Sequence, residues 1–458
     1  MTDKPTSPSS FIDALFERER GMIDDLSQHQ KRAWQHARFY VLTDIASQGT
    51  SMDVPSKPSA SEGAARLIAA IKGIPSFILS LPLLRRADVA FGIHERTRNG
   101  DDQYVGDAAA VLNKQLSTGR QIVFLCDSRS SYSNDRRYIS LEPILALSKL
   151  ISLVTARFTM ILGSWHSSAY RKIIGDSISY RKTDLQRFIQ RTHEKEVLTW
   201  LLARMLSPRL QTLVLSVSYC KTELIGACRR ASTGSARVVE FQHGLISDYH
   251  IGYSGVVADS SLLPDNLALL GQGWSDFMNA DALGALTVGN NHLSGRAPGW
   301  LLVGESGTRI LIVSQRTISK QLSTIVSSSL EQNEDLTFAI KLHPSEYSDH
   351  AYKNLEGNAR VQIIRDASEI KQAIVVDYVA GVYSTLLLEL LSAGISVNVI
   401  DLPGHEKLPT GGDMNLVPRG PLAATNLRRA SVPPQLRQSY FEAFNEQEFL
   451  KVIENNYR

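Results

Sequence analysis

Short apolar segments alternate with longer amphipathic segments over most of the chain, and this alternation limits the possible folds more than any other feature. The apolar segments have the length of strands but lack the polar alternation of a half-exposed strand. Such strands, separated by helices, are typical of a parallel sheet covered on both faces, so the sequence predicts an α/β fold. In the first array, strands are predicted at 87–94, 121–127, 158–164, 211–218 and 236–244, and helices at 141–151 and 183–206.

The alternation begins again after about residue 295, following the Gly-, Pro- and Ser-containing loop NNHLSGRAPGW. A chain of 458 residues is longer than one hydrophobic core usually organises. Two arrays therefore predict two Rossmann-like domains with a cleft between them. No predicted strand is followed by GxGxxG or by GxxxxGK(S/T), which disfavours the usual dinucleotide and P-loop sites. In the second array, strands are predicted at 308–316, 336–344, 360–365, 374–384 and 396–404, and helices at 318–332 and 385–394.

These patterns divide the chain into four parts. Residues 1–61 are predicted to be a helical appendage and linker, because amphipathic segments precede the Ser- and Pro-rich stretch SQGTSMDVPSKPSASEG. Residues 62–294 are the first predicted Rossmann-like domain and residues 295–432 the second. Residues 433–458 are predicted to contain a C-terminal helix that packs back onto the body.

Charge and cysteine content exclude some classes of protein. The net charge of +3 lacks the concentrated Lys and Arg excess of a nucleic-acid-binding surface. The three cysteines, Cys126, Cys220 and Cys228, are scattered and form no CxxC pair. Neither a disulfide framework nor a structural zinc site is therefore supported, and a reducing cytoplasm fits best.

One apolar run could rest on a membrane. The N-terminus is polar where a signal peptide needs an apolar core, and we find no run of about 18 uninterrupted apolar residues. The nearest is FILSLPLL at 77–84, which Arg85 and Arg86 follow at once. A buried core helix or strand is the favoured interpretation, and docking on a membrane surface is the alternative.

Polar residues end the last strand of the first array, in the stretch VVEFQHGLIS. Glu240, Gln242 and His243 follow apolar strand residues, and Gly244 lets the chain turn sharply there. Ligands of open parallel sheets bind at the carboxyl ends of strands. At that position His243 can abstract a proton or hold a phosphate, or it can simply bond to a loop carbonyl. His250 follows within the same loop.

A second polar strand end occurs in LTFAIKLHPSEY. Lys341 and His343 lie two residues apart and so share a face of the strand, while Pro344 ends the ladder and turns the chain outward. Two adjacent cations suit an anionic ligand such as a nucleotide mono- or diphosphate. A turn or cap role for the His-Pro pair is the alternative.

A third strand end leads through Gly381 to Ser384 and Thr385, which begin a predicted helix. Ser and Thr at this position cap free backbone amides, and the same amides attract phosphate. Glu389 follows about one turn later, where it could accept hydrogen bonds from a ribose or from other hydroxyls. An ordinary helix cap is the alternative for the Ser-Thr pair alone.

These three elements, in this order, resemble bacterial GT-B glycosyltransferases that build surface polysaccharides of the capsule and lipopolysaccharide. His343-Pro344 and Ser384-Thr385 resemble the HP and Ser-Ser/Thr motifs of bacterial sialyltransferases and related capsule polymerases. In those families the HP histidine contacts the donor phosphate, and the Ser/Thr pair surrounds it at a helix N-terminus. The stretch QHGLISDYHIGY is also similar to the HG turn of CDP-glycerol transferases. The resemblance covers about 235–405 and implies a nucleotide-sugar site near 313–415, with the acceptor bound by the first domain.

The general base is left open. The sialyltransferases carry an acidic motif that ends in glycine, whereas this chain has only GDD, in RTRNGDDQY, with the glycine on the other side. Asp101 and Asp102 are nevertheless candidate bases because they follow a predicted strand of the first domain. His243 is the competing candidate, and a solvated loop is the alternative for the GDD stretch. No DxD triplet ends a strand, so we expect no metal and no cofactor.

The resemblance predicts a metal-independent glycosyltransferase that moves a sugar to a hydroxyl of a cell-surface glycan. The implied donor is a CMP-sugar such as CMP-sialic acid or CMP-Kdo. A UDP-sugar or CDP-alditol transferase, a nucleotide-sugar 2-epimerase and a non-catalytic assembly subunit are the alternatives. The expected partners are the donor and a glycan acceptor, with no nucleic acid, and the expected location is the cytoplasm, at the inner face of the membrane if the apolar run docks there.

Overall fold

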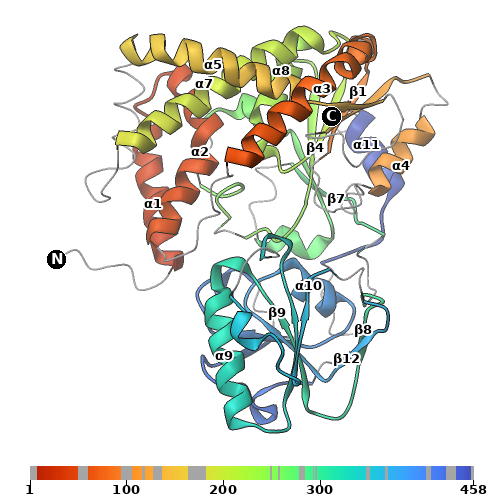
Figure 1. Cartoon of the computed structure of the whole chain (residues 1–458). Coiled ribbons are helices and arrows are strands. Elements are labelled where there is room, and N and C mark those ends of the chain that lie inside the picture. The colour runs from red at the N-terminus through yellow and green to blue at the C-terminus, as the bar shows by residue number, and fades with distance from the viewer. Residues whose placement is uncertain are drawn as a thin grey trace.

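The described part of the computed structural model contains two large parallel sheets with helices packed on them, one above the other in Figure 1. The first sheet is built from the N-terminal two-thirds of the chain and the second from most of the remainder. The structure describes residues 8–49, 60–93, 106–115, 119–126, 137–162, 182–247, 250–255, 258–277, 284–291, 293, 297–346, 351–366, 370–408, 414–429 and 440–454.

The first sheet has seven strands in the order β3-β2-β1-β4-β5-β6-β7, and every neighbouring pair is parallel. This is the doubly wound Rossmann order, which reverses direction between β1 and β4. Strands such as β2 and β4 are buried along their whole length, in keeping with their unbroken apolar sequences. The strands are β1 (Val89–Ile93), β2 (Ile122–Cys126), β3 (Tyr138–Ser140), β4 (Thr212–Ser216), β5 (Arg237–Phe241), β6 (Asn266–Leu269) and β7 (Ala285–Thr287).

The strand predicted at 158–164 is wrong as far as it is described. Its first part belongs to α5 (Glu142–Leu162), and residues 163 and 164 lie outside the described residues. A short apolar run has no periodicity that distinguishes a buried strand from the end of a long helix. Here the helix that begins at Glu142 continues through it.

Helices cover both faces of the first sheet. On one face, α3 (Ala60–Leu84), α5, α7 (Lys182–Met205) and α8 (Thr222–Ala231) lie side by side (Figure 1). The opposite face is covered by α4 (Gly106–Gln115) and α11 (Glu446–Glu454). The rings of Phe449 in α11 and Phe241 in β5 are 5.5 Å apart, so the C-terminal segment packs onto the first sheet.

The N-terminal appendage is two helices, α1 (Pro8–Ile23) and α2 (Gln28–Gly49), which pack against each other and beside α7 and α8 (Figure 1). Arg38 of α2 holds them together, because its Nη2 lies 2.8 Å from Oε2 of the buried Glu19. The same nitrogen donates to the Ser254 carbonyl at 2.7 Å. The appendage is therefore fastened to the loop that follows β5.

The second sheet has the order β11-β10-β9-β13-β14-β15 and is also entirely parallel. Among the described residues, α9 (Ser319–Gln332) and α10 (Thr385–Ser392) pack with it. Two further strands, β8 (Leu301–Val303) and β12 (Ile374–Val376), form a separate pair. The strands of the main sheet are β9 (Arg309–Val313), β10 (Thr337–Lys341), β11 (Val361–Ile364), β13 (Tyr378–Gly381), β14 (Val397–Ile400) and β15 (Met414–Val417).

The single strand predicted at 374–384 is in fact two, β12 and β13, separated at Asp377. The Asp377 carboxylate accepts hydrogen bonds from the amides of Thr308 and Arg309 at 3.1 and 2.9 Å. This buried carboxylate thus binds the amides at the start of β9, and the chain changes its pairing partner from β8 to β9 at Asp377.

The predicted fold class is confirmed by this topology: two Rossmann-like domains, each with the same strand order, and a helical N-terminal segment. The domain boundaries given above stay predictions. In the second sheet, Val313, Lys341 and Gly381 lie in one row of the register, so β9, β10 and β13 end together. The loops that follow these strands therefore leave from a common edge.

Candidate functional site

The loop after β5 meets the start of α10 at the junction of the two domains. The Leu245 amide donates a hydrogen bond to Oγ1 of Thr385 at 3.0 Å. A Cβ on Gly244 would lie 3.3 Å from the same oxygen, tighter than most such contacts. Glycine is therefore favoured at position 244 by this close approach. The predicted sharp turn is not its reason, since the backbone there is not left-handed.

His243 is buried between two tyrosines. Its Nε2 lies 3.0 Å from the Tyr219 hydroxyl, and its Nδ1 lies 3.1 Å from the Tyr253 hydroxyl. Tyr253 donates its proton to Glu240 at 2.7 Å, so its oxygen accepts from Nδ1–H of His243. In the neutral ring Nε2 then carries the lone pair, and it faces Tyr219.

Glu240 is the buried acid of this cluster. The Ser218 amide donates to its Oε1 at 2.9 Å, and the Ser218 hydroxyl bonds to Oε2. Burial raises the pKa of Glu240 above its ordinary value, while the hydrogen bonds from Ser218 and Tyr253 act in the opposite direction. Glu240, Tyr253, His243 and Tyr219 thus form one continuous hydrogen-bonded chain.

A strained residue precedes this cluster. Val217 has φ 61° and ψ 51°, a left-handed conformation that a β-branched residue rarely adopts. It follows β4 directly and comes just before Ser218 and Tyr219, which contact Glu240 and His243. Strain of this kind costs about 1–3 kcal/mol and is concentrated at functional sites. The sequence gives no signal for it, because Val217 reads as one more strand residue.

Two further predicted residues have supporting positions. His250 accepts a hydrogen bond from the Gly252 amide at Nδ1, and its ring centroid is 4.8 Å from that of Tyr253. Gln242 is fully buried and bonds the Leu270 amide and the Gly244 carbonyl, each at 3.0 Å. Gln242 therefore fixes the loop from inside, and its assignment to the cleft stays a prediction. Asp101 and Asp102 lie outside the described residues.

On the other domain, His343 is exposed at the end of β10, as predicted. Its amide donates to Oε2 of Glu346 at 2.7 Å, and Ser314 donates to Oε1 of the same carboxylate at 2.7 Å. Glu346 is buried and so ties the loop after β10 to the loop after β9. Pro344 begins the short 3-10 turn that brings Glu346 into place.

The ammonium of Lys341 makes contacts other than those expected of a ligand-facing cation. Its Nζ donates to the carbonyls of Leu342 and Arg365 at 2.9 and 3.1 Å. Burial lowers the pKa of Lys341, and the nearby carboxylates of Asp366 and Glu346 act to raise it. The ammonium thus already has carbonyl partners beside β10.

The Ser-Thr pair behaves partly as an ordinary cap. Ser384 accepts a hydrogen bond from the Leu386 amide at 3.3 Å and caps α10, and Thr385 is engaged by Leu245. Glu389 lies in the same helix, and burial raises its pKa to about 7. Its change of charge therefore falls near neutral pH.

Sequence analysis missed three residues at this edge. Lys407 has its ammonium 4.7 Å from the ring centroid of Tyr383, and burial lowers its pKa. The Tyr383 hydroxyl bonds to Thr317, in the loop after β9. Nε of Arg316, in the same loop, is buried with no hydrogen-bond partner in the described part of the chain. The polar run SQRT, with which the predicted strand at 308–316 ends, was the available signal for Arg316.

Comparisons with known proteins give structural likenesses only. No family model matches the sequence, and no curated protein matches it either. Among solved structures, UDP-GlcNAc 2-epimerase from Neisseria meningitidis bound to UDP-GlcNAc overlaps 74% of this chain and 88% of its own, with 12% identity and a TM-score of 0.41. MurG from Acinetobacter baumannii overlaps 80% and 94%, with 14% identity and a TM-score of 0.36. S. aureus TarM in complex with UDP overlaps 80% and 93%, with 9% identity and a TM-score of 0.39. With TM-scores below 0.5, these likenesses assign no reaction to this chain.

Proposed function

We propose that this protein is a glycosyltransferase that moves a sugar from a nucleotide-activated donor to a hydroxyl of a cell-surface glycan. The observation that carries the proposal is the junction of the two domains, where the loop of His243 touches the start of α10 at Thr385. This contact supports the proposal that the acid-base chain of one domain works beside the strand-end loops of the other, where the donor would bind. Transfer between two bound substrates needs this kind of juxtaposition.

His243 is the proposed base for the acceptor hydroxyl. Glu240 and Tyr253 orient its ring and stabilise the imidazolium that forms when Nε2 takes up a proton. Tyr219 occupies Nε2, so the acceptor either displaces this phenol or passes its proton through it. Asp101 and Asp102 stay as competing bases.

The phosphate of the departing nucleotide is proposed to be stabilised at the edge where β9, β10 and β13 end. The exposed His343 is the first candidate, and Arg316 is the second because its buried Nε has no partner among the described residues. Donors fixed in place before the reaction stabilise developing charge without reorganisation, each by about 3–4 kcal/mol. We therefore expect that no metal ion is needed.

The proposed donor is a CMP-sugar of the sialic acid or Kdo kind. This identity rests on the resemblance of His343-Pro344 and Ser384-Thr385 to the sialyltransferase motifs, with Ser384 capping a helix as that motif requires. A UDP-sugar or a CDP-alditol donor is the alternative within the same fold. A nucleotide-sugar 2-epimerase is the alternative reaction, and it would turn over donor without any acceptor.

Calorimetry with CMP, CDP, UDP and GDP tests the donor, with His343→Ala measured alongside. We expect selective CMP binding that the variant weakens by about a hundredfold while its melting temperature is unchanged, because His343 is exposed. UDP binding would redirect the donor search. Failure of all four nucleotides to bind would leave the non-catalytic assembly subunit as the better interpretation. Incubation with donor alone, followed by product analysis, separates transfer from epimerisation.

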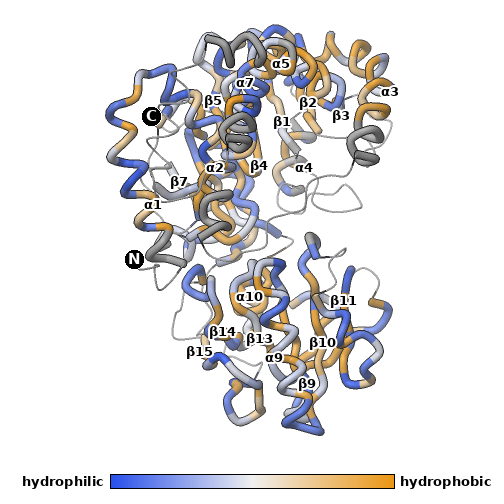
Figure 2. The backbone as a smooth tube through the Cα atoms, turned by 60° about the vertical axis from the view of Figure 1, so that its left-hand side comes forward, coloured by the Kyte–Doolittle hydropathy of each residue, from blue (hydrophilic) through white to orange (hydrophobic). Residues whose placement is uncertain are grey.

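We also propose that the enzyme docks on a membrane through α3 and α5. Within the described residues, one helical segment, Leu67–Leu84, is long and apolar enough to cross a bilayer, but only 22% of it is buried. Of the run at 77–84, which was expected to be a buried core element, Phe77 and Leu84 belong to the core and Leu81 and Leu83 pack against it, whereas Ile78 and Leu79 are exposed. Figure 2 shows α3 and α5 as mainly hydrophobic helices on the outside of the first domain. The exposed apolar side chains of this face are Leu67, Ile68, Ile71, Ile74, Ile78 and Leu79 of α3 and Leu147, Leu150 and Leu153 of α5.

Basic residues next to this face favour an anionic membrane as the partner. Lys72, Arg85 and Arg86 are exposed on or beside α3, and Lys149 is exposed on α5. Such residues attract anionic headgroups by about 1 kcal/mol each. The helices lie flat on the first sheet, which suits a bilayer surface better than a span.

Vesicle co-sedimentation tests the docking face. Ile78→Ser combined with Leu79→Ser should release the protein from vesicles that contain anionic phospholipid, and high salt should weaken binding of the wild type. Leu302→Ser combined with Val303→Ser is the matched control, because these residues are also exposed but lie on β8 of the other domain. Equal loss of binding by both variants, or no binding by the wild type, would contradict the proposal.

A further inference from the structure

A pocket with a volume of about 760 Å³ lies on the outer side of the first domain, among α2, α5, α7 and α8. It is separate from the junction at His243, and none of the residues assigned above to the transfer site lines it. The N-terminal appendage builds one wall, because α2 contributes His29, Arg32 and His36. The appendage thus completes this pocket as well as fastening the loop after β5.

A buried polar atom in the wall of this pocket lacks a partner. His36 is only 1% exposed, and its Nε2 makes no hydrogen bond in the described part of the chain. Its Nδ1 is 2.9 Å from Oγ1 of Thr222, to which Lys195 also donates at 3.2 Å. Burial lowers the pKa of His36 well below its ordinary value, helped by Lys195 and Arg32, so the ring is neutral. An unpaired buried nitrogen costs about 1–3 kcal/mol, which a ligand hydroxyl would recover.

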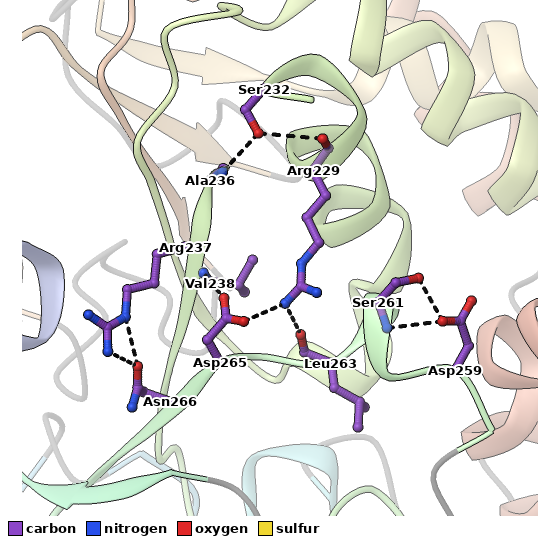
Figure 3. A network of polar contacts seen from close by, with 10 residues as sticks. All are labelled: Arg229, Ser232, Ala236, Arg237, Val238, Asp259, Ser261, Leu263, Asp265 and Asn266. Atoms are coloured by element: carbon purple, nitrogen blue, oxygen red, sulfur yellow. Dashed lines mark hydrogen bonds and ion pairs between the residues drawn. The ribbon is translucent and has the colours of Figure 1, made fainter. Parts of the chain in front are cut away.

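Cations surround the same space. Arg229 is fixed by the Leu263 carbonyl and by Asp265, at 2.8 and 2.9 Å (Figure 3), and its Nε has no partner in the described residues. Arg32 and Arg230 make neither a hydrogen bond nor an ion pair with any described residue. Three guanidinium groups therefore line a pocket in which Glu196 is the one carboxylate among the lining residues.

Two other side chains of the pocket suit a polyol. Oε1 of Glu196 is buried and has no partner among the described residues, so it can accept a hydrogen bond from a hydroxyl. Trp200 is 42% exposed at the rim, and its indole has the Arg204 guanidinium 3.6 Å from its centroid. An indole held in this way offers an apolar plane for the carbon face of a polyol.

We propose that this pocket binds a phosphate group that is attached to a polyol. Arg32 and Arg230 bind the phosphate oxygens, since guanidinium groups match phosphate with paired hydrogen bonds. His36 and Glu196 bind the hydroxyls, and Trp200 covers the carbon skeleton. The ligand is either a soluble sugar phosphate or the headgroup of a lipid such as phosphatidylglycerol, because both contain this chemistry. The proposal does not depend on the reaction proposed above.

Calorimetry on the full chain tests the soluble source, with glucose 1-phosphate, glycerol 3-phosphate, glucose and inorganic phosphate as probes. Flotation with phosphatidylglycerol and phosphatidylcholine vesicles tests the lipid source. The lipid measurement uses the Ile78→Ser/Leu79→Ser background, so that the apolar face does not contribute.

Binding of a phosphorylated polyol in either arm, weakened about tenfold or more by Arg32→Gln with Arg230→Gln, is the expected result. Trp200→Ala should weaken it less, and should not unfold the protein because the ring is partly exposed. Arg209→Gln is the matched control, an exposed arginine outside the pocket that should leave binding unchanged. His343→Ala should also leave it unchanged.

Three outcomes would overturn the proposal. The first is that no probe binds in either arm. The second is that Arg209→Gln weakens binding as much as the double variant does, which would indicate general charge attraction. The third combines two results: inorganic phosphate binds as tightly as glucose 1-phosphate does, and the protein binds phosphatidylglycerol vesicles no better than phosphatidylcholine vesicles. His36 and Glu196 would then contact no hydroxyls.

Discussion

Tyr253→Phe removes one hydroxyl that serves both Glu240 and His243, and its effect can be worked out from the structure. The Glu240 carboxyl loses a 2.7 Å hydrogen bond, and Nδ1 of His243 loses a partner at 3.1 Å. A hydrogen bond to a charged group contributes about 1.5–3 kcal/mol, and leaving a buried donor unpaired costs about 1–3 kcal/mol. Because Ser218 still donates to Glu240, we expect a total loss of about 3 kcal/mol in the free energy of unfolding near neutral pH.

The loss should depend on pH in a defined direction. The folded-state pKa of Glu240 is raised above its ordinary value of 4.5. Such a group contributes stability that is present below the unfolded pKa and lost as the pH rises through the folded pKa. Removing the Tyr253 hydroxyl takes away a donor to the carboxylate and so raises the pKa of Glu240 further. The stability lost between low and high pH is then larger in the variant than in the wild type. The destabilisation should therefore be larger at about pH 8 than at about pH 5.

Urea unfolding of the wild type and of Tyr253→Phe at both pH values is the assay. Thr199→Val is the matched control, since it removes a buried hydroxyl of the same domain that bonds only to backbone carbonyls, of Lys195 and Glu223. Its destabilisation should be the same at both pH values. A pH-independent loss for Tyr253→Phe would refute the reasoning, because Glu240 would then not ionise in contact with this hydroxyl.

Two other predictions concern titrating groups. His36 is buried with its pKa well below the ordinary 6.5, so the stability that it confers is present above pH 6.5 and is lost as the pH falls through the folded pKa. In His36→Asn the melting temperature should fall less steeply with decreasing pH than in the wild type. His29→Asn, which changes an exposed histidine on the same helix, should leave the wild-type slope unchanged. A wild-type slope in His36→Asn would show that His36 is not the group that titrates. Burial raises the pKa of Glu389 to about 7, so nucleotide binding should tighten as the pH rises through 7 if the carboxylate accepts from a ribose. Calorimetry of Glu389→Gln should show affinity that no longer changes with pH, and a pH profile like that of the wild type would remove Glu389 from the nucleotide site.

The fold could be predicted from the sequence because buried parallel strands are continuous runs of apolar residues. β2, β4, β5, β9 and β10 each fall inside a predicted run. Apolar runs gave wrong predictions where contacts between distant parts of the chain determine the secondary structure. The apolar run at 158–162 continues a helix, and the break at Asp377 depends on amides at 308 and 309, nearly seventy residues earlier.

The candidate site was predicted as a set of strand ends but not as a set of contacts. His243 and Thr385 are separated by more than a hundred residues, and only the folded chain shows that the loop of the first meets the second. Tyr219 and Tyr253 carry no motif, and the sequence gives no reason to pair them with His243. Arg316 and Lys407 were missed because an isolated cation after a strand is common, and its burial is visible only in three dimensions.

The strained segment after β4 explains why the two sites of the first domain should be tested by separate variants. Ser218 and Tyr219 contact Glu240 and His243, while Thr222, one turn later, contacts His36 in the wall of the outer pocket. Substitutions in this segment would disturb both places at once, and their effects could not be assigned to either. Arg32 and Arg230 reach the pocket from α2 and α8 and make no hydrogen bond with Ser218, Tyr219 or Thr222 in the described part of the chain, and His343 belongs to the other domain. If the Arg32 and Arg230 variants weaken only phosphate binding, and the His343 variant weakens only nucleotide binding, the protein has two independent sites.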